Sequence, residues 1–204
     1  MFNIITLQKE LFGKNFKLET GRLANKTNSS VYAQLGETSV LVTVVSKPSN
    51  EDLDFLNLRV EYEEKYYASG LISGNRFQRR EGKPSDNAII KGRLIDHAIR
   101  PLFAKDFKDE IQLVINVLSY DGINSPLVLS FLALSAALKI SGVPFKGPIV
   151  LANIINPENP ELTFAESDKE MMLNVSYVGN GDLVQAIEAE AHLIPEDKIV
   201  NAIK

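Results

Sequence analysis

The first sixty residues alternate between apolar and polar side chains with the two-residue period of β-strands. Segments 17–20, 31–35 and 39–45 are short, rich in β-branched residues and separated by glycine-containing turns, and segment 56–62 repeats the alternation. Short strands that follow one another across such turns favour an antiparallel meander. The N-terminal part of the chain is therefore predicted to form a sheet.

Two later segments have the sequence of helices. Ser85 is suited to cap a helix whose first turn contains Asp86, and Pro101 is expected to end it. The most apolar segment, 126–140, is shorter than the ~20 residues that a membrane-spanning helix needs. It is interpreted as a buried helix, and no membrane association is expected.

Strands are predicted around and after these helices. Segment 111–118 is apolar enough for a buried strand, and segments 171–178 and 183–189 are expected to pair across a tight turn at 179–182. A last helix begins at Pro195 and lacks a C-terminal cap, a pattern typical either of a fragment or of a natural C-terminus that frays. One α+β domain, with mixed sheets packed against helices, accounts for the whole chain, residues 1–204.

Composition excludes several kinds of site. The chain has no cysteine, which rules out disulfides, thiolate metal sites and a cysteine nucleophile. Its only histidines, His97 and His192, are too few for a histidine-rich metal centre. The N-terminus also lacks the basic and apolar regions of a signal peptide.

Charge is distributed unevenly along the chain. The net charge is −4, yet segment 76–100 carries +4 and segment 156–204 carries −7. A basic segment of this kind is suited to a polyanionic partner.

The basic segment has the residue types of a single-stranded nucleic-acid site. Phe77 lies beside arginines, so a base could stack on its ring while the guanidinium groups hold phosphates. Helical spacing puts Arg93 and His97 on one face, with Arg100 a turn further. The predicted contacts are Phe77, Arg79, Arg80, Lys83, Arg93, His97 and Arg100. The alternative is a solvated loop that Phe77 anchors to the core, with His97 as a surface residue rather than a catalyst.

Several motifs resemble those of one enzyme family. Segments 60–70, 77–85 and 93–103, with further matches at 136–149 and 187–191, resemble bacterial polynucleotide phosphorylase. The similarity runs in order along nearly the whole chain and corresponds to the first of that family's two RNase PH-like domains. It implies an α+β fold of the ribosomal protein S5 domain 2-like type.

The resemblance also implies a function. The family comprises cytoplasmic, phosphorolytic 3′-to-5′ exoribonucleases that use Mg²⁺ and inorganic phosphate and release nucleoside diphosphates from single-stranded RNA. Its members form ring-shaped homotrimers and join other RNA-degradation proteins. The family loop that matches residues 77–80 grips RNA in the central channel, although Gln78 stands here where a second aromatic is usual.

The same resemblance places the chemistry elsewhere. In the family the phosphate and metal sites belong to the second domain, so no catalytic or metal-binding residue is expected in this chain. The corresponding loop, 122–126, ends in Pro126, which has no N–H for a phosphate. Two hypotheses remain: the N-terminal part of a phosphorylase, or a non-catalytic RNA-binding and ring-scaffold domain like the inactive exosome ring subunits.

Overall fold

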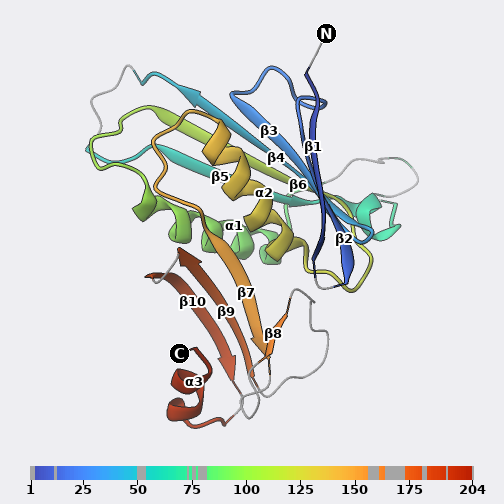
Figure 1. The fold of residues 1–204 in the computed structure, drawn as a ribbon, viewed down its shortest axis with the longest axis vertical. Helices are drawn as coiled ribbons and strands as arrows, with labels where there is room; N and C mark the ends of the chain where they lie inside the picture. The colour runs from blue at the N-terminus through green and yellow to red at the C-terminus, as the bar shows by residue number, and fades with distance from the viewer. Residues whose placement is uncertain are drawn as a thin grey trace.

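A six-stranded sheet forms the larger part of the structure (Figure 1). The computed structural model describes residues 3–11, 13–49, 54–72, 74, 77, 82–155, 161–163, 173–180, 183–191 and 193–203. The strands of this sheet are β1 (Ile5–Leu11), β2 (Lys14–Thr20), β3 (Ser29–Leu35), β4 (Thr38–Lys47), β5 (Leu58–Glu64) and β6 (Glu110–Ser119). Their spatial order is β1-β2-β3-β4-β6-β5.

The predicted meander is confirmed for segments 17–20, 31–35 and 39–45, which form β2, β3 and β4 and pair antiparallel in sequence order. β1, which pairs antiparallel with β2, is a strand that the sequence pattern does not predict. β5 departs from the meander, because β6 lies between it and β4, and β5 pairs with β6 in parallel. Parallel strands need a long crossover connection, and a helical segment between β5 and β6 supplies it.

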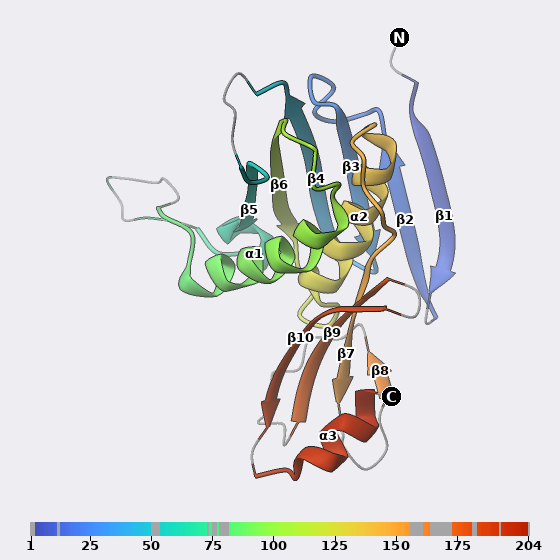
Figure 2. The same cartoon turned by 90° about the vertical axis from the view of Figure 1, so that its left-hand side faces the viewer.

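Two helices cover one face of this sheet (Figure 2). α1 (Asp86–Ile99) follows a short 3₁₀ turn, η1 (Tyr66–Ser69), and continues into a second one, η2 (Arg100–Leu102). The Ser85 hydroxyl accepts a hydrogen bond from the Ala88 N–H at 3.1 Å, which confirms the predicted cap. α2 (Pro126–Ile140) has the predicted bounds and packs against β3 and β4.

The core lies between these helices and the sheet. Alternate residues of β3, β4 and β6 are buried, as the two-residue period predicts. Both layers contribute fully buried side chains, among them Leu113 of β6, Ile95 of α1, and Phe131 and Leu134 of α2. The apolar segments singled out in the sequence therefore form one continuous core.

A smaller antiparallel sheet follows α2. It contains β7 (Val150–Ile155), β8 (Glu161–Thr163), β9 (Leu173–Asn180) and β10 (Leu183–Ala191), in the order β10-β9-β7-β8. The predicted pairing of the last two strands is confirmed, although β9 continues through Asn180, inside the segment predicted as a turn. α3 (Glu196–Ile203) packs Ile199 and Ile203 against Ile154 of β7.

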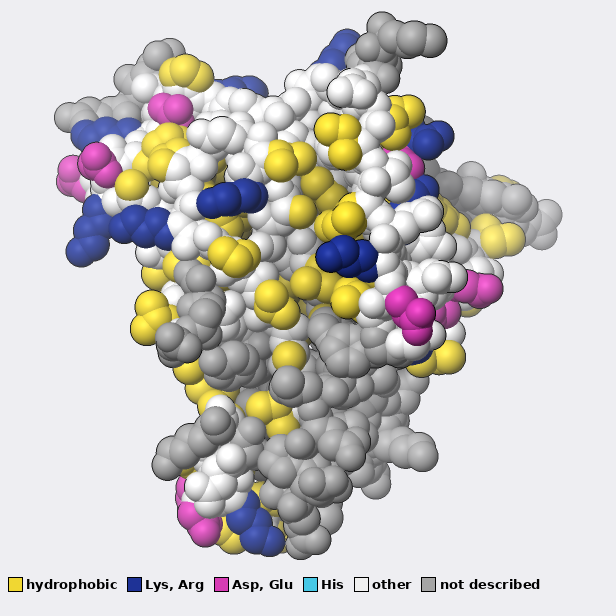
Figure 3. Space-filling view, in the orientation of Figure 1, with side chains coloured by type: hydrophobic (Ala, Val, Ile, Leu, Met, Phe, Trp, Pro, Cys, Tyr) yellow, Lys and Arg dark blue, Asp and Glu magenta, His cyan; other side chains and the backbone are white. Residues whose placement is uncertain are grey.

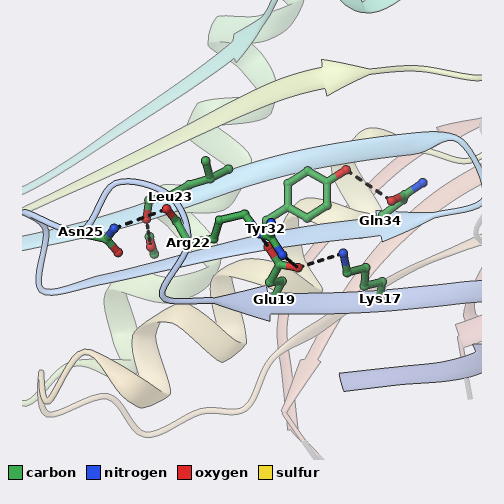
Figure 4. Close-up of polar contacts among 8 residues, drawn as sticks. Lys17, Glu19, Arg22, Leu23, Asn25, Tyr32 and Gln34 are labelled. Atoms are coloured by element: carbon green, nitrogen blue, oxygen red, sulfur yellow. Dashed lines mark hydrogen bonds and ion pairs between the residues drawn. The ribbon is translucent and has the colours of Figure 1, made fainter. Parts of the chain in front are cut away.

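A charged cluster on β2 and the turn after it lies near the polar side chains of β3 (Figure 4). The Glu19 carboxylate is 4% exposed and lies 2.8 Å from the Lys17 ammonium, and Arg22 donates to it as well. Hydrogen bonds from Lys17 and then from Arg22 hold the pKa of Glu19 below its usual range. The buried carboxylate is thus compensated from two sides.

Candidate nucleic-acid interface

α1 presents its basic face to a groove. Leu94, Ile95 and Ala98 are buried in the core, whereas Arg93 and His97 are exposed. This division confirms the two faces that the helical spacing predicts. It also leaves both basic side chains accessible to a ligand.

The wall opposite α1 comes from β10. A groove of about 670 Å³ runs between the two elements. Its charged lining consists of Arg93, His97, Arg100 and Glu188, and its apolar lining includes Ile90 and Ile187. The groove therefore combines cationic groups for phosphates with apolar surface for bases.

Arg93 lies on the ridge between two hollows. It also lines a groove of about 580 Å³ on the other side of α1, along the outer strand β5. Gly92 brings the helix close to that strand, because a Cβ added there would lie 3.6 Å from the Tyr62 Cβ. Arg93 could therefore contact a phosphate that lies in either groove.

Arg100 is held within the chain. Its guanidinium donates to both carboxylate oxygens of Asp96, at 2.7 and 3.2 Å, and to the carbonyls of Leu56 and Leu58, at 2.9 and 3.2 Å. These bonds fasten the end of α1 to the start of β5. The predicted role of Arg100 in RNA binding stays a prediction, but most of its donors already serve the fold.

The other predicted contacts lie before α1. Phe77 is 83% exposed, so its ring does not anchor the loop in the core. Lys83 is exposed just before the Ser85 cap. Arg79 and Arg80 lie outside the described residues.

On the face seen in Figure 3 the described basic residues form separate spots, some beside acidic side chains and others among hydrophobic and uncharged ones. They make no continuous basic track on that face.

Among the described residues, no group of three or more His, Asp or Glu side chains is placed to hold a metal ion. No helix in the described part of the chain is both long and apolar enough to cross a membrane.

The backbone N–H groups of the turn before α2 form hydrogen bonds within the turn itself. The Asp121 carboxylate accepts from the N–H groups of Ile123 and Asn124, at 2.9 and 2.8 Å, and from the Asn124 side chain. Partial burial opposes ionisation of Asp121, but the bonds from Asn124 and Ile123 hold its pKa well below the usual range. Ser125 is buried, and Pro126 has no N–H. These residues do not fit a phosphate or Mg²⁺ site.

We expect Asp121→Ala to lower the free energy of unfolding at neutral pH by about 1–3 kcal/mol, because it leaves the N–H groups of Ile123 and of buried Asn124 without their acceptor. The lowered pKa means that the carboxylate stabilises the fold above about pH 4 and loses this effect as the pH falls. Urea denaturation measures the free energy of unfolding at about pH 7 and about pH 3. Between these two pH values it should fall less for Asp121→Asn than for the unchanged chain. Asp106→Asn, at an exposed site, is the control; an equal drop for both variants would contradict the assignment.

Comparison with known proteins identifies the family. The sequence profile described as 3′ exoribonuclease family, domain 1 (RNase PH) matches residues 13–144. The chain belongs to this family. The match covers the six-stranded sheet from β2 onward and both of its covering helices, and the α+β RNase PH-like fold expected from the motifs is confirmed.

Two relatives of this RNase PH domain share a name. Polyribonucleotide nucleotidyltransferases of Nitratidesulfovibrio vulgaris and Rhodopseudomonas palustris (strain TIE-1) are 42% and 44% identical to it over its whole length. The chain spans only 27% and 28% of the length of these two enzymes. The resemblance to polynucleotide phosphorylase is confirmed.

A solved structure shares the fold. Rice (Oryza sativa) Rrp46 superposes with a TM-score of 0.68 at 14% sequence identity, covering 99% of this RNase PH domain and 86% of the rice chain. At that identity the likeness concerns the architecture alone.

Sequence reasoning missed two features of the interface. The β10 wall could not be assigned to α1 from residue spacing, because about 90 residues separate Glu188 from the basic face. The ion pair between Arg100 and Asp96 could have been predicted from the sequence, because Asp96 precedes Arg100 by four residues, the spacing of a helical ion pair.

Proposed function

We propose that this chain is the RNA-binding first RNase PH domain of a phosphorolytic 3′-to-5′ exoribonuclease. The observation that carries the proposal is the α1–β10 groove, in which exposed Arg93 and His97 stand beside apolar surface. Single-stranded RNA offers both the phosphates and the unpaired bases that such a groove suits. Phe77, Arg79, Arg80 and Lys83 would extend the contact beyond the helix.

The proposed roles divide between charge and stacking. Arg93, His97 and Lys83 would contact phosphates, and Phe77 would stack on a base. Arg100 would act mainly by holding α1 in place, because its donors bond to Asp96 and to backbone carbonyls.

The complete enzyme would supply what this domain lacks. Mg²⁺ and inorganic phosphate would bind in the second domain, which the family likeness associates with the chemistry. We further propose that the enzyme works in the cytoplasm as a homotrimeric ring and joins other RNA-degradation proteins.

A non-catalytic RNA-binding and ring-scaffold domain is the second candidate. Both candidates agree with the turn before α2, where Asp121 occupies the backbone donors and Pro126 offers none. The two candidates make the same statement about the isolated chain and differ in the protein to which it belongs.

The test is phosphorolysis by the purified 204-residue chain, supplied with poly(A), Mg²⁺ and inorganic phosphate. We expect the chain to bind the RNA without phosphate-dependent release of ADP, since phosphorolysis needs charge stabilisation at the reacting phosphate that the described residues do not provide. The polyribonucleotide nucleotidyltransferase of Nitratidesulfovibrio vulgaris, assayed beside it, is the positive control. ADP release by the chain would contradict the absence of a catalytic site, and failure to bind RNA would contradict the proposed function.

A further inference from the structure

The α1–β10 groove has two chemically different walls. The α1 wall carries the exposed basic residues Arg93 and His97, whereas the β10 wall carries the carboxylate of Glu188. The two elements lie close together, with β10 below the helix in the view of Figure 1. A phosphate is attracted by the arginine and repelled by the carboxylate. Bound RNA would therefore place its backbone along α1 and turn its bases toward β10.

β10 meets the groove along its free edge. It is the outer strand of the smaller sheet, and four consecutive residues, 185–188, line the groove. Because successive side chains of a strand point to opposite faces, a run of four indicates that the groove follows the edge of the strand. Bases that enter the groove would meet the polar side chains of this edge, Gln185 and Glu188.

Glu188 is accessible to a ligand. Its side chain is exposed, and among the described residues it has no hydrogen-bond or ion-pair partner. An ionised carboxylate accepts hydrogen bonds and donates none, whereas the amide of Gln185 can do both. Gln185 can thus pair with any base, and discrimination between bases by their donors and acceptors falls to Glu188.

We propose that Glu188 makes the groove prefer bases with an exocyclic amino group, and cytosine over uracil in particular. The proposal rests on the function proposed above, in which the groove holds single-stranded RNA. Cytosine has an amino donor at the ring position where uracil has a carbonyl acceptor, and carboxylates accept hydrogen bonds from that amino group. Glu188 can therefore bind cytosine, while at uracil two acceptors would face each other.

The expected result is a difference in affinity between two pyrimidine ligands. Oligocytidylate should bind the chain about fivefold more tightly than oligouridylate of the same length, near the lower end of the discrimination that a base-specific contact provides. Both ligands carry the same phosphates, and phosphate contacts hold no sequence information. The ratio of the two affinities therefore isolates the contact to the base.

Fluorescence anisotropy of the two labelled oligonucleotides, at neutral pH and one salt concentration, measures this ratio. Glu188→Gln should bring the ratio close to one, because glutamine can donate to uracil as well as accept from cytosine. Glu196→Gln is the matched control. It removes the same charge from the exposed start of α3, outside the groove, and should keep the preference of the unchanged chain.

The outcomes distinguish this proposal from the proposed function. A ratio close to one in the unchanged chain, or the same preference in the unchanged chain and in Glu188→Gln, would overturn the role of Glu188 and leave RNA binding standing. Loss of the preference in Glu196→Gln would overturn it as well, since net charge would then set the ratio. No binding of either oligonucleotide by the unchanged chain would overturn both proposals.

Discussion

The Phe131→Ala substitution is expected to lower the free energy of unfolding by about 3–5 kcal/mol. Phe131 is fully buried in α2, where the helix packs against β3 and β4. Removing the ring leaves a cavity in the core, which can collapse only in part. Because small domains have a total stability of about 5–15 kcal/mol, the loss would be a large share of it.

Urea denaturation followed by far-ultraviolet circular dichroism gives the measurement. Ile140→Ala is the control, since it shortens an apolar side chain at the exposed end of the same helix, where Ile140 is 53% exposed. The control should lose less than about 1 kcal/mol. Similar losses for both variants would contradict the placement of Phe131 at the centre of the core.

Local signals are sufficient for most individual elements. α2 begins at Pro126 and ends at Ile140 as predicted, because proline is favoured in the first helical turn and Gly142 follows the end. β3 and β4 each bury one face, so their sequences alternate clearly. Where burial is one-sided, the sequence reveals the element.

β1 lacks that signal. All but its last residue are exposed, so neither face is constrained to be apolar, and the strand is defined by its pairing with β2. The order of the strands is also beyond local reasoning. The parallel pairing of β5 with β6 joins segments separated by α1, and nothing within either strand specifies its neighbour.

The interface likewise has one part that local sequence predicts and another that depends on long-range packing. The basic face of α1 follows from helical spacing, because Arg93 and His97 are one turn apart. The groove exists only because the second sheet brings Glu188 and Ile187 opposite that face. Residue types alone favour a class of ligand, whereas long-range packing determines the shape of the site.

The double substitution Arg79→Ala with Arg80→Ala should weaken the binding of single-stranded RNA by about tenfold at about 0.1 M salt. Both arginines follow the exposed ring of Phe77 in the sequence. Their guanidinium groups can therefore bind the backbone phosphates of a nucleotide whose base stacks on that ring. Losing two phosphate contacts should also flatten the slope of log affinity against log salt concentration by about 1.4. Titrations at several salt concentrations measure both effects.

A matched control separates a local contact from a general loss of positive charge. Lys105→Ala with Lys108→Ala removes the same charge from exposed positions between η2 and β6. Because long-range attraction between exposed charges is screened within about 10 Å at 0.1 M salt, this control should leave affinity and salt slope nearly unchanged. Equal weakening by both double variants would show that net charge rather than the Phe77 loop governs binding. An unchanged salt slope in the arginine variant would exclude Arg79 and Arg80 from the phosphate contacts.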